Sequence, residues 1–133
     1  MKKLLVLFLS MAFLVACSND DDNGEQGPDP IIGTWVLVDV SAPLDSQFCS
    51  EEVSTMTFNS NNTGTATFYL TSSECNATTA PGTWANNGNS AYTITVPVLG
   101  SLQGTANFTS NNSRFAFTTA VFGLPGTLTF EKQ

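Results

Sequence analysis

The stretch TATFYLT, residues 65–71, alternates between two kinds of side chain. Its odd positions hold threonine and tyrosine, whereas its even positions hold alanine, phenylalanine and leucine. A period of two is typical of a β-strand with one face buried and the other in water. The same alternation, with threonine on the wet face, returns at 91–97 and 126–132. The stretch therefore predicts a chain built from half-buried strands.

Turns rich in asparagine separate the alternating runs, for example at 59–64, 86–89 and 110–113. We expect eight strands, at about 33–41, 53–59, 64–71, 82–86, 91–97, 104–109, 113–119 and 126–132. Most connections are short, so neighbouring strands should pair antiparallel. Eight short strands without a long helical pattern predict an all-β, up-and-down antiparallel barrel. A two-sheet β-sandwich is the alternative.

The amino-terminal residues have the features of an export signal. Two lysines precede an apolar run at 4–15, which is shorter than the roughly 20 residues that a membrane-spanning helix needs. The sequence LVAC, residues 14–17, resembles the bacterial lipobox. That resemblance implies that residues 1–16 are a lipoprotein signal peptide and that Cys17 carries the lipid that anchors the mature chain in the membrane. The alternative is a plain secreted chain with an unmodified Cys17.

Residues 17–30 predict a disordered linker between the anchor and a barrel domain at 31–133. After Cys17 the segment is acidic and has no apolar residue other than proline. Its acidic cluster resembles the surface-export signal of Bacteroidetes lipoproteins, which implies the outer face of the outer membrane. The alternative is a solvated spacer on a lipoprotein that faces the periplasm. The cluster also has the look of a calcium loop, but the twelfth position, which needs a glutamate, is Pro30.

Acidic residues dominate the mature chain. The whole chain has 4 basic and 11 acidic residues, and removal of Lys2 and Lys3 leaves two basic residues, Arg114 and Lys132, and a net charge of −9. Nucleic acid is therefore not expected as a partner, because phosphate contacts need lysine and arginine. An acidic surface is also repelled by anionic headgroups, which leaves the lipid as the link to the membrane.

The cysteine and histidine counts bear on chemistry. Cys49 and Cys75 form an even pair in a chain that we expect to be exported, which predicts a disulfide. Two free thiols or half of a metal site are the alternatives. The chain has no histidine, which excludes Ser-His-Asp and Cys-His catalysis and zinc held by histidine. We therefore expect no catalytic residue, no metal site, no cofactor and no enzymatic activity.

Gly33-Thr34-Trp35, after the acidic linker, resembles the start of the lipocalin-like domains of Bacteroidetes lipoproteins. In those domains a cysteine precedes the second strand and an aromatic-x-Lys motif ends the chain, which Cys49 and Phe130-Glu131-Lys132 match. The likeness covers 31–133 and implies a lipocalin-like barrel. Classical lipocalins pair the first-strand tryptophan with an arginine after the last strand, but the one arginine here, Arg114, lies in the seventh expected strand.

The expected inward face of the barrel is rich in phenylalanine. An eight-stranded barrel is either filled by its own side chains or just wide enough for one small ligand. A cavity would favour a carrier of a small hydrophobic molecule. A filled barrel with an exposed apolar patch would favour a non-enzymatic interaction module, for example an accessory subunit of a surface complex. The apolar stretches 98–100 and 121–125 are candidates for a cavity mouth or a partner patch. The candidate ligand-binding residues are Phe58, Phe68, Tyr92, Phe108, Phe115, Phe117 and Phe130.

Overall fold

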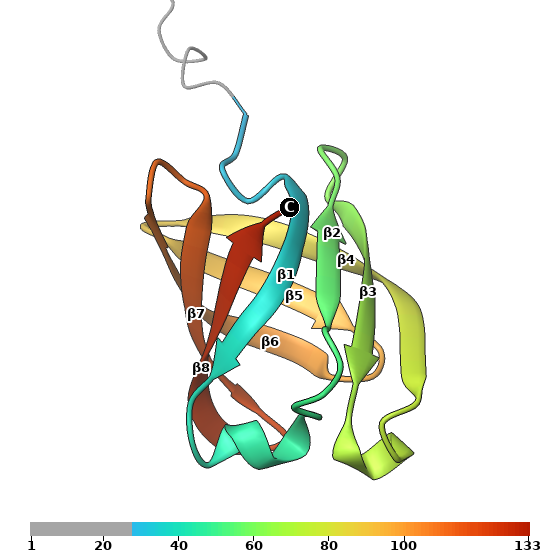
Figure 1. Cartoon of the computed structure of the whole chain (residues 1–133). Helices are drawn as coiled ribbons and strands as arrows, with labels where there is room; N and C mark the ends of the chain where they lie inside the picture. Colours follow the sequence, from blue (N-terminus) through green and yellow to red (C-terminus); the bar gives the residue numbers. More distant parts are fainter. Residues whose placement is uncertain (1–27) are drawn as a thin grey trace, which may run out of the picture.

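The computed structural model describes residues 28–133, in which eight antiparallel strands follow one another in chain order around a closed barrel (Figure 1). The all-β barrel prediction is confirmed, and the sandwich alternative is wrong. The predicted signal peptide, Cys17 and the predicted linker up to residue 27 lie outside the described residues. The strands are β1 (Gly33–Val40), β2 (Thr55–Phe58), β3 (Thr63–Tyr69), β4 (Ala77–Gly88), β5 (Ala91–Val96), β6 (Gly100–Thr109), β7 (Arg114–Val121) and β8 (Leu124–Lys132).

Alternation along the strands decides which side chains face the interior. In β5, Tyr92, Ile94 and Val96 are buried, and the threonines between them lie on the outer face, half-buried among their neighbours. One cluster of buried side chains fills the barrel from β1 to β8. The connections are mostly tight turns, such as Phe122-Gly123 between β7 and β8, where both residues have positive φ. Such turns match the right-handed twist of the strands that they join.

β4 differs most from its predicted range of 82–86, since it begins at Ala77. Pro81 lies within this extension, although proline lacks the N–H that a ladder uses. In the structure Pro81 lies opposite Thr65 of β3, and the pairing continues on both sides of it. β5 pairs with β4 only from Thr83 onward. Pro81 therefore lies where β4 has a single neighbour, the kind of edge position that tolerates proline.

The two expected apolar loops are also partly absorbed into strands. β6 begins at Gly100 rather than 104, and the preceding Leu99 is buried in the core. Val121 ends β7 with its side chain fully buried, so Phe122, 48% exposed, is the one large apolar side chain of that stretch that reaches well into solvent. β2 is shorter than expected and begins at Thr55, which leaves Val53 outside the sheet.

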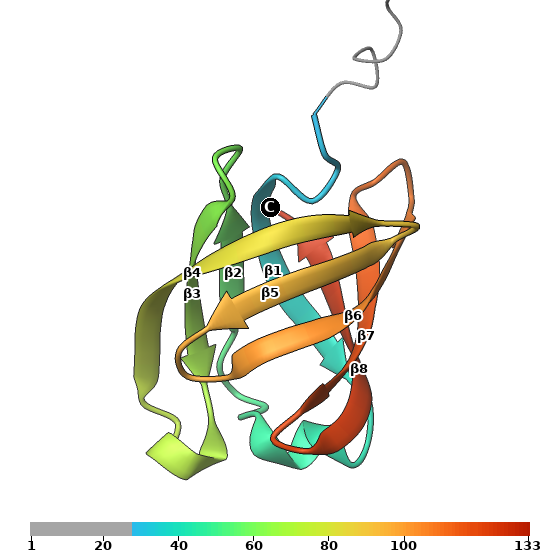
Figure 2. The ribbon, with the colours of Figure 1, turned by 180° about the vertical axis from the view of Figure 1, so that it is seen from behind.

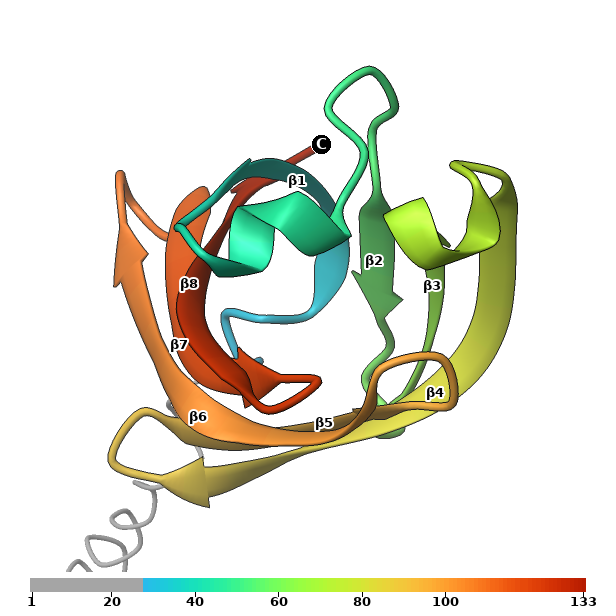
Figure 3. The same cartoon turned by 90° about the horizontal axis from the view of Figure 1, so that it is seen from below.

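The barrel has two distinct ends. Residues 28–32 and the carboxyl terminus lie at one end, called here the tether end (Figures 1 and 2). Two short 3₁₀ helices, η3 (Leu44–Gln47) and η4 (Thr71–Ser73), lie at the opposite end, called here the far end, where η3 partly covers the mouth of the barrel (Figure 3). Leu44 of η3 is fully buried and anchors this cover in the core.

Candidate functional site

The seven candidate ligand-binding residues converge on the interior, as predicted. They come from six strands, and all are buried except Phe108, which is half-buried. The rings lie against one another: the Phe115 centroid is 4.6 Å from that of Trp35, 4.9 Å from that of Phe130 and 5.1 Å from that of Phe108. Such aromatic pairs add roughly 0.5–1.5 kcal/mol beyond their burial. In this part of the barrel the candidate residues form a packed core.

Trp84 of β4 belongs to the same interior but was missed in the sequence. Its ring centroid lies 6.2 Å from that of Phe58 and 6.3 Å from that of Tyr92, and its Nε1 donates a hydrogen bond to the carbonyl of Asn59 at 2.9 Å. The space beside Trp84 and Met56 has a volume of about 10 Å³. A cavity of that size holds about one water molecule and no larger ligand.

Asp29 closes the tether end of the barrel. Its carboxylate accepts hydrogen bonds from the Tyr92 hydroxyl at 2.6 Å, the Asn86 amide at 2.7 Å and the Ile31 backbone N–H at 3.0 Å. Burial raises the pKa of Tyr92 far above its usual range, and the hydrogen bond and negative charge of Asp29 raise this pKa further. Ile31 is fully buried and accepts a hydrogen bond from Trp35 Nε1 at 2.7 Å. Contacts with the barrel thus begin two residues before the expected linker boundary.

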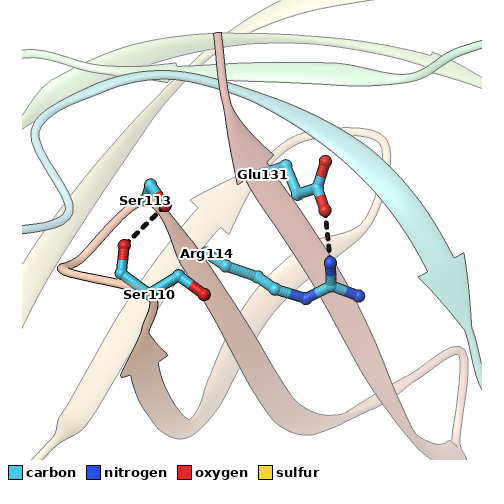
Figure 4. Close-up of polar contacts among 4 residues, drawn as sticks. All are labelled: Ser110, Ser113, Arg114 and Glu131. Atoms are coloured by element: carbon cyan, nitrogen blue, oxygen red, sulfur yellow. Dashed lines mark hydrogen bonds and ion pairs between the residues drawn. The ribbon is translucent and has the colours of Figure 1, made fainter.

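Both basic side chains of residues 28–133 also lie at the tether end. Lys132 places its Nζ 5.0 Å from the ring centroid of Trp35, so a lysine of β8 takes the place over this tryptophan that an arginine holds in classical lipocalins. Arg114 of β7 points instead across to Glu131 of β8 and forms an ion pair with it (Figure 4).

The far end carries an open groove, called here the far groove, with a volume of about 250 Å³. It lies between the far half of β1 and the 49–54 loop, which runs from η3 to β2. Leu37 and Val40 at its floor pack against the core, and Phe48 belongs to the core with its ring 6.1 Å from that of Phe68. The lining residues are Leu37, Val38, Asp39, Val40, Asp45, Phe48, Cys49, Ser50, Glu52 and Ser54.

A disulfide fixes one wall of the far groove. Cys49 is bonded to Cys75, with a Cα–Cα distance of 5.8 Å, which confirms the predicted pairing. The backbone N–H of Cys49 donates a hydrogen bond to the carbonyl of Tyr69. The backbone N–H of Tyr69 donates a hydrogen bond to the Ser54 Oγ. The two hydrogen bonds attach both ends of the 49–54 loop to Tyr69 of β3, and the disulfide joins its first residue to Cys75. The groove is therefore held open by covalent and hydrogen bonds.

The chemistry available in residues 28–133 is limited. No group of three or more histidine, cysteine, aspartate or glutamate side chains lies in a position to hold a metal ion within that range. The polar residues of the far groove are three exposed carboxylates, the exposed Ser50, the half-buried Cys49 and the buried Ser54. The far groove is open to solvent, so a partner could reach it from outside the barrel.

The family model described as a lipocalin-like domain matches residues 31–119 of the chain. The chain belongs to the lipocalin-like domain family. The predicted lipocalin-like family is thereby confirmed, whereas the Bacteroidetes lipoprotein context stays a prediction. Families with lipocalin-like barrels are typically non-enzymatic proteins that bind small hydrophobic ligands.

The search of curated proteins found no match. Among solved structures, a variant of the fluorescent protein UnaG matches the lipocalin-like chain with a TM-score of 0.45 and 8% identity. That match covers 78% of this chain and 96% of the other.

No helix within residues 28–133 has the length and apolar character needed to cross a bilayer.

Proposed function

We propose that this lipocalin-like protein is a non-enzymatic binding protein that a lipid on Cys17 holds at the outer membrane, on its outer face, and that the far groove is its binding site. The observation that carries the proposal is the contrast between the two candidate spaces. The interior space beside Trp84 has a volume of about 10 Å³, whereas the far groove has about 250 Å³ and is open to solvent. Ligand pockets usually begin near 300 Å³, so only the second is close to a useful size.

The position of the groove also suits a tethered protein. Asp29 holds the start of the described chain at the tether end. The helix η3, which contributes Asp45 to the far groove, lies at the opposite end (Figure 1). The twelve-residue separation of Cys17 and Asp29 spans at most about 40 Å when extended. A chain anchored at Cys17 would therefore present the far groove away from the membrane.

A carrier of a small hydrophobic molecule is the second candidate. It is favoured by the apolar interior, to which six strands contribute the seven candidate residues, and by the ligands typical of the family. A ligand in this interior would have to displace packed rings, such as Phe115 from Trp35 and Phe130. Displacement of buried rings loses packing energy, whereas a ligand that binds outside the barrel displaces no buried ring.

Native mass spectrometry of protein purified from its source separates the two candidates. We expect a bound mass on the wild-type protein that is absent from the Val38→Trp variant, because Val38 lines the groove and is 43% exposed. The control is Phe122→Trp, which adds similar bulk at an exposed site on the β7–β8 turn, outside the groove. A lipid-like mass that survives in both variants would contradict the groove and support the interior carrier.

A further inference from the structure

The far half of β1 has a free edge. β1 pairs with β2 only where residues 33–36 face 55–58. One more backbone hydrogen bond follows, from the Leu37 N–H to the Ser54 carbonyl at 2.9 Å. On its other side β1 pairs with β8 as far as Val40, with a register shift between Leu37 and Asp39 that leaves Val38 outside the pairing. Residues 39 and 40 therefore have a paired strand neighbour on one side only, as do residues 77–82 of β4.

This edge borders the far groove and is exposed. Val38 is 43% exposed and Val53 is 57% exposed. Val38 follows Leu37 and Val53 precedes Ser54, and the backbone hydrogen bond between Leu37 and Ser54 is the last one that joins β1 to the chain before β2. Only Phe122, of the other large apolar side chains in the described range, is similarly exposed. Unpaired backbone groups beside exposed valines are the features with which an edge strand accepts another chain.

The charge of the groove selects among possible partners. Asp39, Asp45 and Glu52 line it, all three are exposed, and no basic residue lines it. The two cations of residues 28–133 are engaged at the tether end, Arg114 with Glu131 and Lys132 over the Trp35 ring. The acidic groove would therefore attract a positively charged partner and repel a negatively charged one.

We propose that the far groove binds an extended, basic peptide segment that adds a strand to the free edge of β1. In strand addition, main-chain hydrogen bonds give affinity and pockets for alternate side chains give specificity. One set of side chains would face the apolar floor at Leu37, Val40 and Phe48, and the other set, lysine or arginine, would face the carboxylates. This inference rests on the proposed function, since it names the partner of the same groove.

A second copy of the chain does not fit this edge. Pairing β1 with β1 of another copy would bring two sets of the same acids, including Asp39, to one interface. Like charges placed together at an interface cost several kcal/mol. A small organic cation would meet the carboxylates but would leave the free edge of β1 without a strand partner. An extended basic peptide satisfies both features.

The test uses detergent-solubilised mature protein and three labelled hexapeptides with blocked ends. One peptide alternates lysine and valine, the second alternates glutamate and valine, and the third is the first with N-methyl groups on alternate backbone nitrogens. Fluorescence anisotropy gives the dissociation constants. We expect the lysine peptide to bind at least tenfold more tightly than either of the others. We also expect slower amide hydrogen exchange at Val38 or Val40 when it is bound, because strand pairing protects these groups.

Charge variants complete the test. Asp39→Asn combined with Glu52→Gln should weaken binding of the lysine peptide at least fivefold, whereas Glu131→Gln, which removes an acid at the tether end, should leave it unchanged. Equal affinity for the lysine and glutamate peptides, or no effect of N-methylation, would overturn the inference. If these peptide results fail while Val38→Trp still removes the bound mass from source-purified protein, the inference falls and the proposed function stands.

Discussion

Removal of the Cys49–Cys75 disulfide gives the most direct test of how the far end is stabilised. The two cysteines are 26 residues apart in the chain. In the chain-entropy model, closing a loop of that length lowers the entropy of the unfolded chain enough to stabilise the fold by about 3.5 kcal/mol at 25 °C. We expect the double variant Cys49→Ala/Cys75→Ala to lose about that much free energy of unfolding. For a barrel of this size the loss is a large share of a total stability of roughly 5–15 kcal/mol.

Urea unfolding followed by tryptophan fluorescence measures this loss. Trp35 and Trp84 are both buried in the core, so their fluorescence reports on the whole barrel. The wild-type protein in reducing agent is the matched control and should lose the same free energy as the double variant. The tryptophan bands of the near-ultraviolet circular dichroism spectrum should change little, since the entropy term acts on the unfolded chain. A loss below about 1 kcal/mol for the double variant would refute the chain-entropy reasoning.

Three further results are expected. Cys17→Ala should release the protein from the membrane fraction, and continued membrane association would contradict the lipid anchor. Tyr92→Phe removes the hydrogen bond to Asp29 and should cost about 1.5–3 kcal/mol in urea unfolding, as for hydrogen bonds to charged groups. Because the folded state raises the pKa of Tyr92, its contribution is complete below about pH 10 and is lost above it, so the difference between wild type and Tyr92→Phe should shrink at alkaline pH. Gly104→Ala should cost about 1–3 kcal/mol, because its Cβ would collide with the Thr118 carbonyl oxygen, whereas Gln103→Ala on the same strand should have little effect.

Local alternation made the architecture predictable. In the stretch TATFYLT, the even positions Ala66, Phe68 and Leu70 are buried, as their period of two indicated. The seven candidate interior residues also lie inside, because a strand of a barrel has only two faces and the apolar one must face the core. The disulfide was predictable from cysteine count and expected export, without any knowledge of distance.

Other features depended on context that alternation does not contain. Trp84 shares a face with Gly82 and Asn86, so its neighbours give no apolar pattern, and only the packing against Phe58 and Tyr92 shows its place. The extension of β4 back to Ala77 depends on β3, which supplies hydrogen-bond partners on both sides of Pro81. Lys132 covers Trp35 because β8 pairs with β1 and brings the end of the chain beside its beginning.

The sequence by itself determined an eight-stranded barrel with an aromatic interior, since burial of alternate side chains is a local property of each strand. Only the tertiary structure decided that this interior is packed beside Trp35 and that a groove opens at the far end. The run from Val53 to Thr55 was expected within one strand, yet pairing with β1 stops at Ser54, and the preceding loop is bonded to Tyr69 and Cys75 instead. Where two strands part is set by contacts between distant residues, and at this parting the acidic edge of β1 is exposed.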